Sequence, residues 1–367
     1  MKSSLSHDEL ATEPRRHLLG CDLAELTQWL GAAGQPRYRA EQILKWIFER
    51  RAENFDDMSN LPKSLRACLG QNAAIYSSTI SRDSLAEDGT RKLLLEFPDG
   101  AAAETVWIPA GERNTACLST QVGCPVGCAF CASGIGGFER NLTAGEIVEQ
   151  ALRVQQLIVG AAQEGDSPRL SNIVIMGMGE PLANYDETIK AIRIINAPWG
   201  VGIGARKITL STVGTPKQIR RLAGEDLQLN LALSLHAPDD KLRNEFIPWA
   251  RSAPVKDLVE ACGDYFKTTG REITLEYVLL EGVNNDPTRA DQLAKIAKRL
   301  RANVNLLRYN HVPGLPFQRP RAESAYEFQQ RLRKLGVNAH VRTSRGRDAD
   351  AACGQLRRVA REDQDGS

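Results

Sequence analysis

Three closely spaced cysteines, Cys124, Cys128 and Cys131, are the part of this sequence with the clearest chemical meaning. Thiolates bind soft metals, so a C-x3-C-x2-C run predicts either a zinc ion or an iron–sulfur cluster. A structural zinc ion needs four ligands, and no neighbouring fourth cysteine or histidine completes this set. Three thiolates on a four-iron cluster would leave one iron open for a ligand, and we favour the cluster.

A glycine-rich turn at residues 177–181 (GMGEP) follows an apolar run that ends at Met176. Glycine lets the backbone approach a ligand closely, and the carboxylate of Glu180 can accept a hydrogen bond from an ammonium group. On its own, a turn of this kind is more often only a turn. Its position one strand after the cysteines favours a shared binding site.

The elements that must position these residues are short apolar runs that alternate with helical patterns from about residue 115 onward. The runs fall at residues 116–118, 173–176, 208–211, 229–235, 273–280 and 304–307. Repeated strand-then-helix units predict an α/β fold with a parallel sheet, either doubly wound or a whole or partial barrel. We count six units, fewer than the eight of a closed barrel, and in both architectures ligands bind at the carboxyl ends of the strands.

The flanking segments predict a division into three parts. Residues 1–90 carry helical periodicity and form a small accessory domain. From Arg91 the period changes to two, and Asp99-Gly100 marks the turn of a β-hairpin that leads into the barrel of residues 91–347. Residues 348–367 are a C-terminal segment with a polar tail that we expect to be disordered.

Composition excludes several classes of protein. The 367 residues are 42% hydrophobic and 25% charged, which is typical of a globular protein and rules out a disordered chain, a collagen or a coiled coil. No apolar run approaches the ~18 residues of a membrane span, and the N-terminus lacks the apolar core of a secretory signal. Eight cysteines are too few for a disulfide scaffold, so we expect a soluble, cytoplasmic protein.

Charge is more informative locally than over the whole chain, whose net charge is +2. Residues 295–347 hold thirteen lysines and arginines against two glutamates. An excess of this size favours contact with a phosphate backbone, and the alternative is a set of solvated helix faces.

Two isolated cysteines complete a recognisable pattern. Cys117 lies seven residues before the cysteine run, and Cys353 lies in the sequence AACGQL; taken singly, each is expected to be a small buried hydrophobe. The run itself, with its aromatic Phe130, resembles the signature of the radical S-adenosylmethionine (SAM) superfamily. Together with the sequence ETVWIP that begins at Glu104, the two cysteines closely resemble the radical SAM RNA adenosine methyltransferases, the family of RlmN and Cfr, and most of all its RlmN branch. The resemblance extends from about residue 37 to residue 356.

The resemblance implies a partial (β/α)6 radical SAM barrel with a small N-terminal helical domain that binds RNA. It also implies a role for thirteen positions, several of which would be unremarkable without it. These are the cluster ligands Cys124, Cys128 and Cys131, the SAM contacts Gly179, Glu180, Ser211, Ser234, Leu235, His236 and Asn310, and the catalytic residues Cys353, Cys117 and Glu104.

The implied reaction overcomes the poor nucleophilicity of the adenine ring carbons. One SAM methylates Cys353, and a second supplies a 5′-deoxyadenosyl radical that takes a hydrogen from this methyl group, so that the resulting radical adds to adenine. Glu104 then removes the ring proton, and Cys117 forms a disulfide with Cys353 that releases the methylated RNA. The implied cofactors are a 4Fe-4S cluster and two SAM molecules per turnover. The implied partners are 23S rRNA, tRNA and an electron donor such as flavodoxin or ferredoxin. We expect no membrane partner, and we expect the enzyme to be a monomer.

Two alternatives remain open. The loop at residues 132–143 favours the RlmN-type outcome: methylation at C2 of an adenosine in the peptidyl-transferase region, and of the adenosine next to the anticodon in some tRNAs. The Cfr-type outcome, methylation at C8, uses the same catalytic positions. An alternative of another class is a nonenzymatic iron–sulfur or zinc protein that binds RNA, although such a protein has no use for the thiol pair Cys117 and Cys353.

Overall fold

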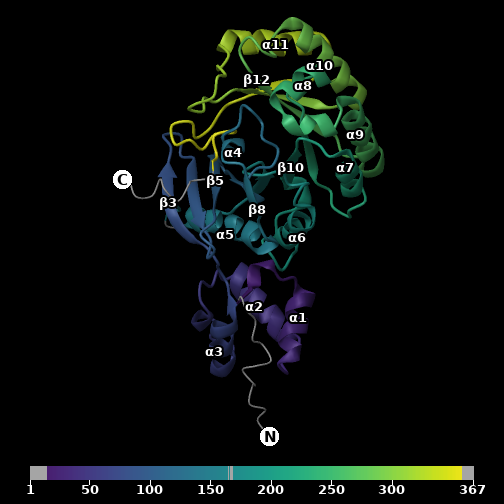
Figure 1. Ribbon diagram of the computed structural model, residues 1–367. Helices are drawn as coiled ribbons and strands as arrows, with labels where there is room; N and C mark the ends of the chain where they lie inside the picture. Colours follow the sequence, from purple (N-terminus) through teal and green to yellow (C-terminus); the bar gives the residue numbers. More distant parts are fainter. Residues whose placement is uncertain (1–14, 164, 166–167, 358–367) are drawn as a thin grey trace.

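The structure is a computed structural model that describes residues 15–163, 165 and 168–357, so the expected disordered tail lies outside the described residues. Its centre is one sheet of ten strands in the order β14-β13-β12-β11-β10-β9-β6-β5-β4-β3 (Figure 1). Its seven parallel strands are β6 (Arg113–Cys117), β9 (Asn172–Ile175), β10 (Ile208–Thr212), β11 (Asn230–Ser234), β12 (Ile273–Leu279), β13 (Asn303–Arg308) and β14 (Ala339–Arg342). The six predicted strands are confirmed, and β14 is an additional one.

Helices connect successive parallel strands and cover the outer face of the sheet (Figure 1). They are α5 (Ala144–Gly160), α6 (Tyr185–Asn196), α7 (Pro216–Ala223), α8 (Asp240–Phe246), α9 (Val255–Thr269), α10 (Pro287–Leu300) and α11 (Ala322–Lys334). The α5 helix begins with a capping box in which the Thr143 side chain accepts from the Glu146 backbone N–H and the Glu146 carboxylate accepts from that of Thr143. Within the described residues, no helix is both long enough and apolar enough to cross a membrane.

Alternation along the parallel strands separates a core face from a site face. In β10 the side chains of Ile208 and Leu210 are buried in the main hydrophobic core. Polar side chains occupy the opposite face near the carboxyl ends, where Ser234 of β11 pairs in register with Glu276 of β12, and Glu276 pairs with Asn305 of β13. The sheet therefore presents a row of polar groups to the barrel interior.

A three-stranded antiparallel extension precedes the barrel and consists of β3 (Thr79–Leu85), β4 (Arg91–Glu96) and β5 (Ala102–Ala110). The β4–β5 hairpin is confirmed, and Gly100 in its turn has a φ of 77° that favours glycine. The expectation of helix up to about residue 90 is wrong at β3. This strand lies at the sheet edge and carries mostly exposed polar side chains, so it lacks the apolar alternation that marks a strand.

Residues 345–357, here called the strap, follow β14 and run back across the turn between β3 and β4 (yellow in Figure 1). The Gly346 N–H donates to Asp88 Oδ2 over 3.0 Å, and Asp348 Oδ2 accepts from the Glu87 N–H over 2.8 Å. Glycine is required at 346, because a Cβ atom there would lie 2.7 Å from Thr90 Cγ2. The strap thus has a fixed position, and it carries Cys353.

The N-terminal helices form a small domain at one end of the barrel (purple in Figure 1). Its elements are β1 (Arg16–His17), α1 (Leu23–Ala32), α2 (Tyr38–Phe48), α3 (Lys63–Asn72) and β2 (Ala73–Ala74), which pairs with β1. Leu26, Ile43 and Leu69 are buried in the same continuous core as the barrel residues. Short 3₁₀ turns lie at Leu18–Gly20, Phe55–Asp57, Ala205–Lys207 and Pro248–Ser252.

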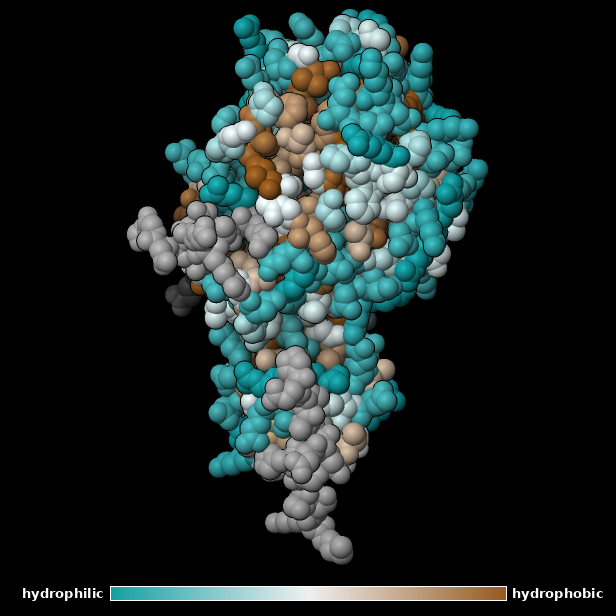
Figure 2. Space-filling model, viewed as in Figure 1, coloured by the Kyte–Doolittle hydropathy of each residue, from teal (hydrophilic) through white to brown (hydrophobic). Residues whose placement is uncertain are grey.

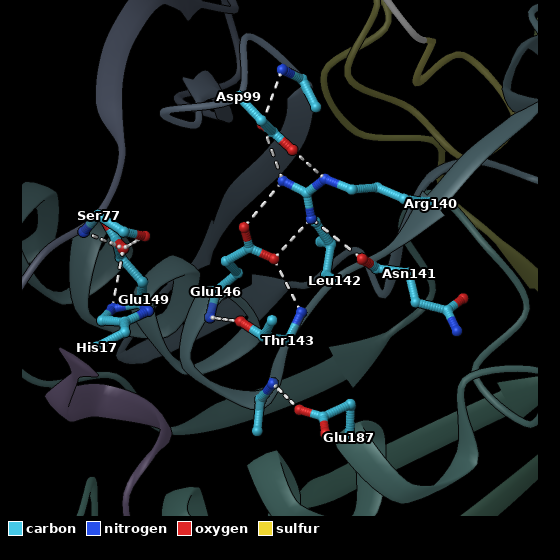
Figure 3. A network of polar contacts seen from close by, with 12 residues as sticks. His17, Ser77, Asp99, Arg140, Asn141, Leu142, Thr143, Glu146, Glu149 and Glu187 are labelled. Carbon is cyan, nitrogen blue, oxygen red and sulfur yellow. Dashed lines mark hydrogen bonds and ion pairs between the residues drawn. The ribbon is translucent and has the colours of Figure 1, made fainter. Parts of the chain in front are cut away.

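A fully buried carboxylate, that of Glu149 on α5, joins this domain to the barrel (Figure 3). It accepts hydrogen bonds from the backbone and the hydroxyl of both Ser77 and Ser78, over 2.5–3.0 Å. Arg153 Nη2 lies 3.3 Å from one of its oxygens, and His17 Nε2 lies 3.4 Å from the other. The chain that leaves the accessory domain is therefore fixed to α5 by charge-assisted hydrogen bonds.

A second polar node fixes the hairpin to the same helix. The Arg140 guanidinium donates to both carboxylate oxygens of Asp99, in the hairpin turn, and to both of Glu146, in the first turn of α5 (Figure 3). The guanidinium also donates to the Asn141 carbonyl over 3.0 Å and lies over the Phe97 ring, 5.2 Å from its centroid. These two carboxylates hold the pKa of Arg140 above its usual range, although burial opposes them. The cysteine-bearing loop, which ends near Arg140, is thereby anchored to the barrel.

We expect Glu149→Gln to destabilise the protein strongly. A glutamine at this position presents an NH₂ group to donors that need an acceptor, and it leaves the Arg153 cation without its partner. The free energy of unfolding should fall by about 3–5 kcal/mol. Urea denaturation measures this change. The control is Glu41→Gln on α2, which is half-exposed and 3.9 Å from Arg37, and its effect should stay below about 1 kcal/mol. Equal losses would contradict the role assigned to Glu149.

Candidate active site

A pocket of about 990 Å³, partly open to solvent, lies at the carboxyl ends of the parallel strands. In the view of Figure 2, apolar surface gathers in the upper part of the molecule near the strap, while most of the surrounding surface is hydrophilic. The pocket brings together ten of the thirteen predicted site residues. These are Cys124, Cys128, Cys131, Gly179, Glu180, Ser211, Ser234, His236, Asn310 and Cys353.

The cysteine loop is clamped by two short strands, β7 (Gln121–Gly123) and β8 (Phe138–Asn141), and by the short helix α4 (Ala132–Ile135). The Cys124 N–H donates to the Gly137 carbonyl over 3.1 Å. Phe130 packs edge-on against the His236 imidazole, with ring centroids 5.2 Å apart. Neighbours on both sides thus support the conformation of this loop.

The three loop thiols are suited to metal binding rather than to existence as free thiolates. Burial raises the pKa of Cys124 to about 12, and it also raises the pKa of Cys128 and of Cys131. A bound metal replaces the thiol proton and stabilises the thiolate. Among the described residues, no three His, Cys, Asp or Glu side chains are grouped to hold one metal ion. In a four-iron cluster each thiolate binds a separate iron, so the thiols need not converge on one point.

Glu180 offers a positioned carboxylate on another side of the pocket. Its Oε1 accepts from the Leu182 N–H over 2.9 Å and from Thr212 Oγ1 over 2.7 Å, and its Oε2 accepts from the Val213 N–H over 2.9 Å. Burial raises the pKa of Glu180, and these donors act in the opposite direction. A carboxylate has about four acceptor positions, so one remains for a ligand ammonium group.

Gly179 is required by the close approach of the neighbouring chain. Its φ is 103°, and a Cβ atom there would lie 2.7 Å from Gln121 Cβ and 2.9 Å from Gln121 N. The Gln121 amide oxygen in turn accepts from the Glu180 N–H over 2.7 Å. Glycine at 179 therefore permits a close approach, and the approaching residue is Gln121 of the protein itself; the approach of a ligand to this turn stays a prediction.

His236 and two serines occupy the ends of β10 and β11. Ser211 Oγ and Ser234 Oγ lie 3.0 Å apart. His236 Nδ1 accepts from the Val278 N–H over 3.1 Å, and burial together with Arg243 lowers the pKa of His236 to about 3. The imidazole is therefore neutral with its proton on Nε2. Its left-handed backbone, with a φ of 58°, is held by Asn284, whose amide donates to the His236 carbonyl.

Asn310 links the end of β13 to the strap. Its Nδ2 donates to the Cys353 carbonyl over 3.0 Å, and its Oδ1 accepts from Arg319 over 2.7 Å. The Asn310 amide therefore places Cys353 in the pocket. The pKa of Cys353 is raised to about 11 by loss of solvation in the pocket and by Glu276, whereas Arg342 acts to lower it.

Cys353 also lines a second recess, of about 850 Å³, and this one includes Cys117. Cys117 lies at the end of β6 among Val106, Met178 and Leu356, and burial raises its pKa above the usual range. Both cysteines are free thiols. The structure thus brings together two cysteines that are more than two hundred residues apart in the sequence.

Two predicted site residues lie outside both recesses. The Leu235 side chain is buried in the main core, although its backbone N–H donates to the Glu276 carbonyl over 3.1 Å. Glu104 is buried on β5, where its Oε2 accepts from the Arg357 N–H of the strap over 2.9 Å. Loss of solvation raises the pKa of Glu104.

The sequence analysis overlooked Glu276, which lines the first pocket from β12 and accepts from Asn305 Nδ2 over 2.8 Å. Its signal was the single acidic residue in the apolar run ITLEYVL, since a charge in a buried strand needs a specific partner. It also overlooked Tyr309, whose hydroxyl is buried without a hydrogen-bond partner in the described residues and whose side chain lines the same pocket.

The basic segment has two kinds of member. Arg331 is paired with Asp291, and Arg308 donates to the Pro320 carbonyl, so these charges serve the fold. Arg342 and Arg345 are exposed and line the recess that holds Cys117. Only part of the predicted positive excess is therefore available to an anionic ligand.

Comparison with known proteins identifies both parts of the chain. Residues 16–75 match the family described as "Ribosomal RNA large subunit methyltransferase N-terminal domain", and residues 118–294 match the "Radical SAM superfamily". The "Probable dual-specificity RNA methyltransferase RlmN" of Syntrophomonas wolfei is 43% identical over 347 residues, which are 94% of this chain and 97% of the relative. This chain belongs to the RlmN family of radical SAM RNA methyltransferases.

Other RlmN relatives and a solved structure agree. The "Dual-specificity RNA methyltransferase RlmN" of Syntrophus aciditrophicus is 43% identical over 342 residues, 93% of this chain and 96% of the relative. The crystal structure of a radical SAM methyltransferase from Sphaerobacter thermophilus is 45% identical, with a TM-score of 0.90, and the match covers 93% of this chain and 99% of that one. The radical SAM fold is therefore confirmed, and membership in an enzyme family decides against a nonenzymatic RNA-binding protein.

The RlmN family takes a 4Fe-4S cluster and SAM, and the donors in the first pocket fit both. Cys124, Cys128 and Cys131 would hold the cluster, because the three thiols of this loop line the same pocket. Glu180, with its free acceptor position, would bind the amino group of SAM. The hydroxyls of Ser211 and Ser234 add polar groups on the same side of the sheet.

We expect Gly179→Ala to weaken SAM binding by at least roughly tenfold. The added methyl group would displace Gln121, and with it the Glu180 carboxylate. A tenfold loss corresponds to about 1.4 kcal/mol. Equilibrium dialysis with labelled SAM measures the affinity. The control is Gly263→Ala on α9, where a Cβ atom would meet nothing within 4 Å. Unchanged affinity in Gly179→Ala would show that the turn does not position Glu180.

Proposed function

We propose that this enzyme methylates C2 of an adenosine in the peptidyl-transferase region of 23S rRNA and C2 of the adenosine next to the anticodon in tRNA. The observation that carries the proposal is the pair of free thiols: Cys117 and Cys353 face one recess, and Cys353 also lines the pocket with the three loop cysteines. Two close relatives are named as dual-specificity RNA methyltransferases, which supports action on more than one RNA.

The residues have successive roles in the proposed reaction. When bound, the cluster and SAM supply a methyl group and a radical that abstracts hydrogen. Cys353 carries the methyl group and holds the RNA base covalently during transfer. Glu104 accepts the proton that leaves the adenine ring, and the unpaired electron of the adduct would return to the cluster. The Cys117 thiol then loses its proton and attacks the Cys353 sulfur, so that the bond from this sulfur to the RNA-bound carbon breaks, this carbon takes up a proton to become the methyl group, and a disulfide remains.

The position of the two cysteines supports this order of events. Cys353 lies between the two recesses, so its sulfur can meet SAM on one side and the Cys117 thiol on the other. The exposed Arg342 and Arg345 at the second recess provide cations for phosphates of the incoming nucleotide.

The proposal also includes the cellular setting. Each turnover leaves a disulfide that must be reduced, which fits a cytoplasmic enzyme. An electron donor such as flavodoxin or ferredoxin would reduce the cluster, and a monomer contains every residue named above. We propose residues 1–90 as the RNA-binding accessory domain, residues 91–347 as the barrel and residues 348–367 as the segment that presents Cys353.

The test uses the reconstituted holoenzyme with a reductant, methyl-deuterated SAM and unmodified rRNA or tRNA, without oxygen. The RNA is digested to nucleosides, which are identified by chromatography and mass spectrometry. Labelled 2-methyladenosine is expected from both RNAs. Labelled 8-methyladenosine would assign the chain to the Cfr-type outcome, and SAM cleavage without any methyladenosine would overturn the proposed substrate.

We expect Cys353→Ala to bind SAM but to form no methyladenosine, because no thiol remains to carry the methyl group. SAM affinity and nucleoside analysis measure the two properties separately. The control is Cys262→Ala, at a thiol buried on α9 in the core. Normal turnover by Cys353→Ala would contradict the covalent mechanism.

Cys117→Ala should have a different effect. Methyl transfer proceeds to the covalent stage, but no thiol attacks Cys353, so a protein–RNA adduct should accumulate. A denaturing gel with labelled RNA detects this adduct. Clean release of methylated RNA by this variant would show that Cys117 does not resolve the adduct.

A further inference from the structure

A buried lysine, Lys92 on β4, contacts both Glu104 and the strap. Its side chain is only 10% exposed, and its Nζ lies 2.8 Å from Glu104 Oε1. The same Nζ donates to the Asp350 carbonyl over 3.0 Å. One ammonium group thus joins two strands of the sheet extension to the segment that carries Cys353.

The sheet register places Lys92 on the same face as Cys117. Lys92 pairs with Val106 across β4 and β5, and Val106 pairs with Cys117 across β5 and β6. Residues paired across an antiparallel sheet project from the same face. Glu104, two positions along β5 from Val106, also projects from this face, on which Leu356 of the strap packs.

The Lys92–Glu104 pair has a clear electrostatic purpose. A buried carboxylate is costly unless it is paired and hydrogen-bonded. Glu104 has both kinds of partner, because its Oε2 accepts from the Arg357 N–H while its Oε1 faces Lys92. Burial raises the pKa of Glu104; the charged groups that lower it are Lys92 on β4 and Arg357 on the strap.

We propose that Lys92 is a positioning residue that keeps Glu104 ionised to act as a proton acceptor and holds the strap beside it. This inference rests on the proposed function, in which Glu104 receives the adenine ring proton. Once Glu104 is protonated, its contacts with the Lys92 ammonium group and with the Arg357 N–H of the strap lose their ionic part, while Lys92 keeps its bond to the Asp350 carbonyl. The strap is therefore held most firmly before proton transfer.

The first test compares Lys92→Met with Lys92→Arg. Lys92→Met keeps the length of the side chain and removes the charge, so product formation should fall roughly hundredfold at neutral pH. Without the ammonium group the Glu104 pKa rises. When the pH is lowered, the carboxylate is therefore protonated at a higher pH than in the wild type. The acid limb of the rate profile should accordingly shift to higher pH. Lys92→Arg should restore most of the rate, and Lys267→Met, at an exposed lysine on α9, should match the wild type.

The second measurement separates this role from a merely structural one. Lys92→Met should still methylate Cys353, seen as a mass increase of the intact protein, and should accumulate the protein–RNA adduct. If Lys92→Met does not fold, the double variant Lys92→Met/Glu104→Gln removes both charges together and should fold, because no unpaired charge is buried. The double variant should show the same adduct.

Three outcomes would overturn the inference. A wild-type rate and pH profile for Lys92→Met would show that the charge is not needed. If both the single and the double variant lost Cys353 methylation as well as product formation, Lys92 would have a structural role only. A wild-type enzyme that forms no methyladenosine would overturn the proposed function, and this inference would fall with it.

Discussion

Across the described residues the central sheet does not close, and the arrangement of the site depends on that fact. Closed eight-stranded barrels fill their interior with side chains. Within the part of the chain that the structure describes, β14 and β3 are the edges of the sheet, and the carboxyl ends of the parallel strands surround a pocket that is partly open to solvent. The strap crosses from β14 to the hairpin, and it delivers Cys353 to the rim of this pocket. The open edge thus gives the segment that carries Cys353 a path to the pocket.

Burial of charge in this site is managed by neutral donors as well as by opposite charges. Glu180 is held by two backbone N–H groups and a threonine hydroxyl, and Glu276 by an asparagine amide. Glu104 alone among these three carboxylates has a lysine within 3 Å. Polar groups held by hydrogen bonds in this way need little reorientation during a reaction, which is the physical basis of electrostatic preorganisation. Glu180 and Glu276 thus have only neutral hydrogen-bond donors, whereas Glu104 also has a cation.

Local patterns predicted much of the fold and the centre of the site. The six apolar runs all became parallel strands, because a strand buried on both faces needs a continuous apolar sequence. β14 was missed since its four residues, AHVR, include only two apolar side chains, and β3 was missed because an edge strand has one solvated side. The cysteine run and the glycine turn each lie within a few consecutive residues, so the sequence alone could predict them as parts of the site. The contacts of Cys353 with Asn310, and of Lys92 with Glu104 and Asp350, depend on register and on chain reversal over long distances, so no periodicity in the sequence encodes them.

The buried Glu149 node has a consequence for how RNA molecules are distinguished. Four hydrogen bonds and an arginine fix the chain between the accessory domain and the barrel, and the two parts share one hydrophobic core. A linker of this kind cannot act as a hinge. In the proposed reaction, an RNA that contacted both parts would therefore have to span a set separation, whatever its sequence.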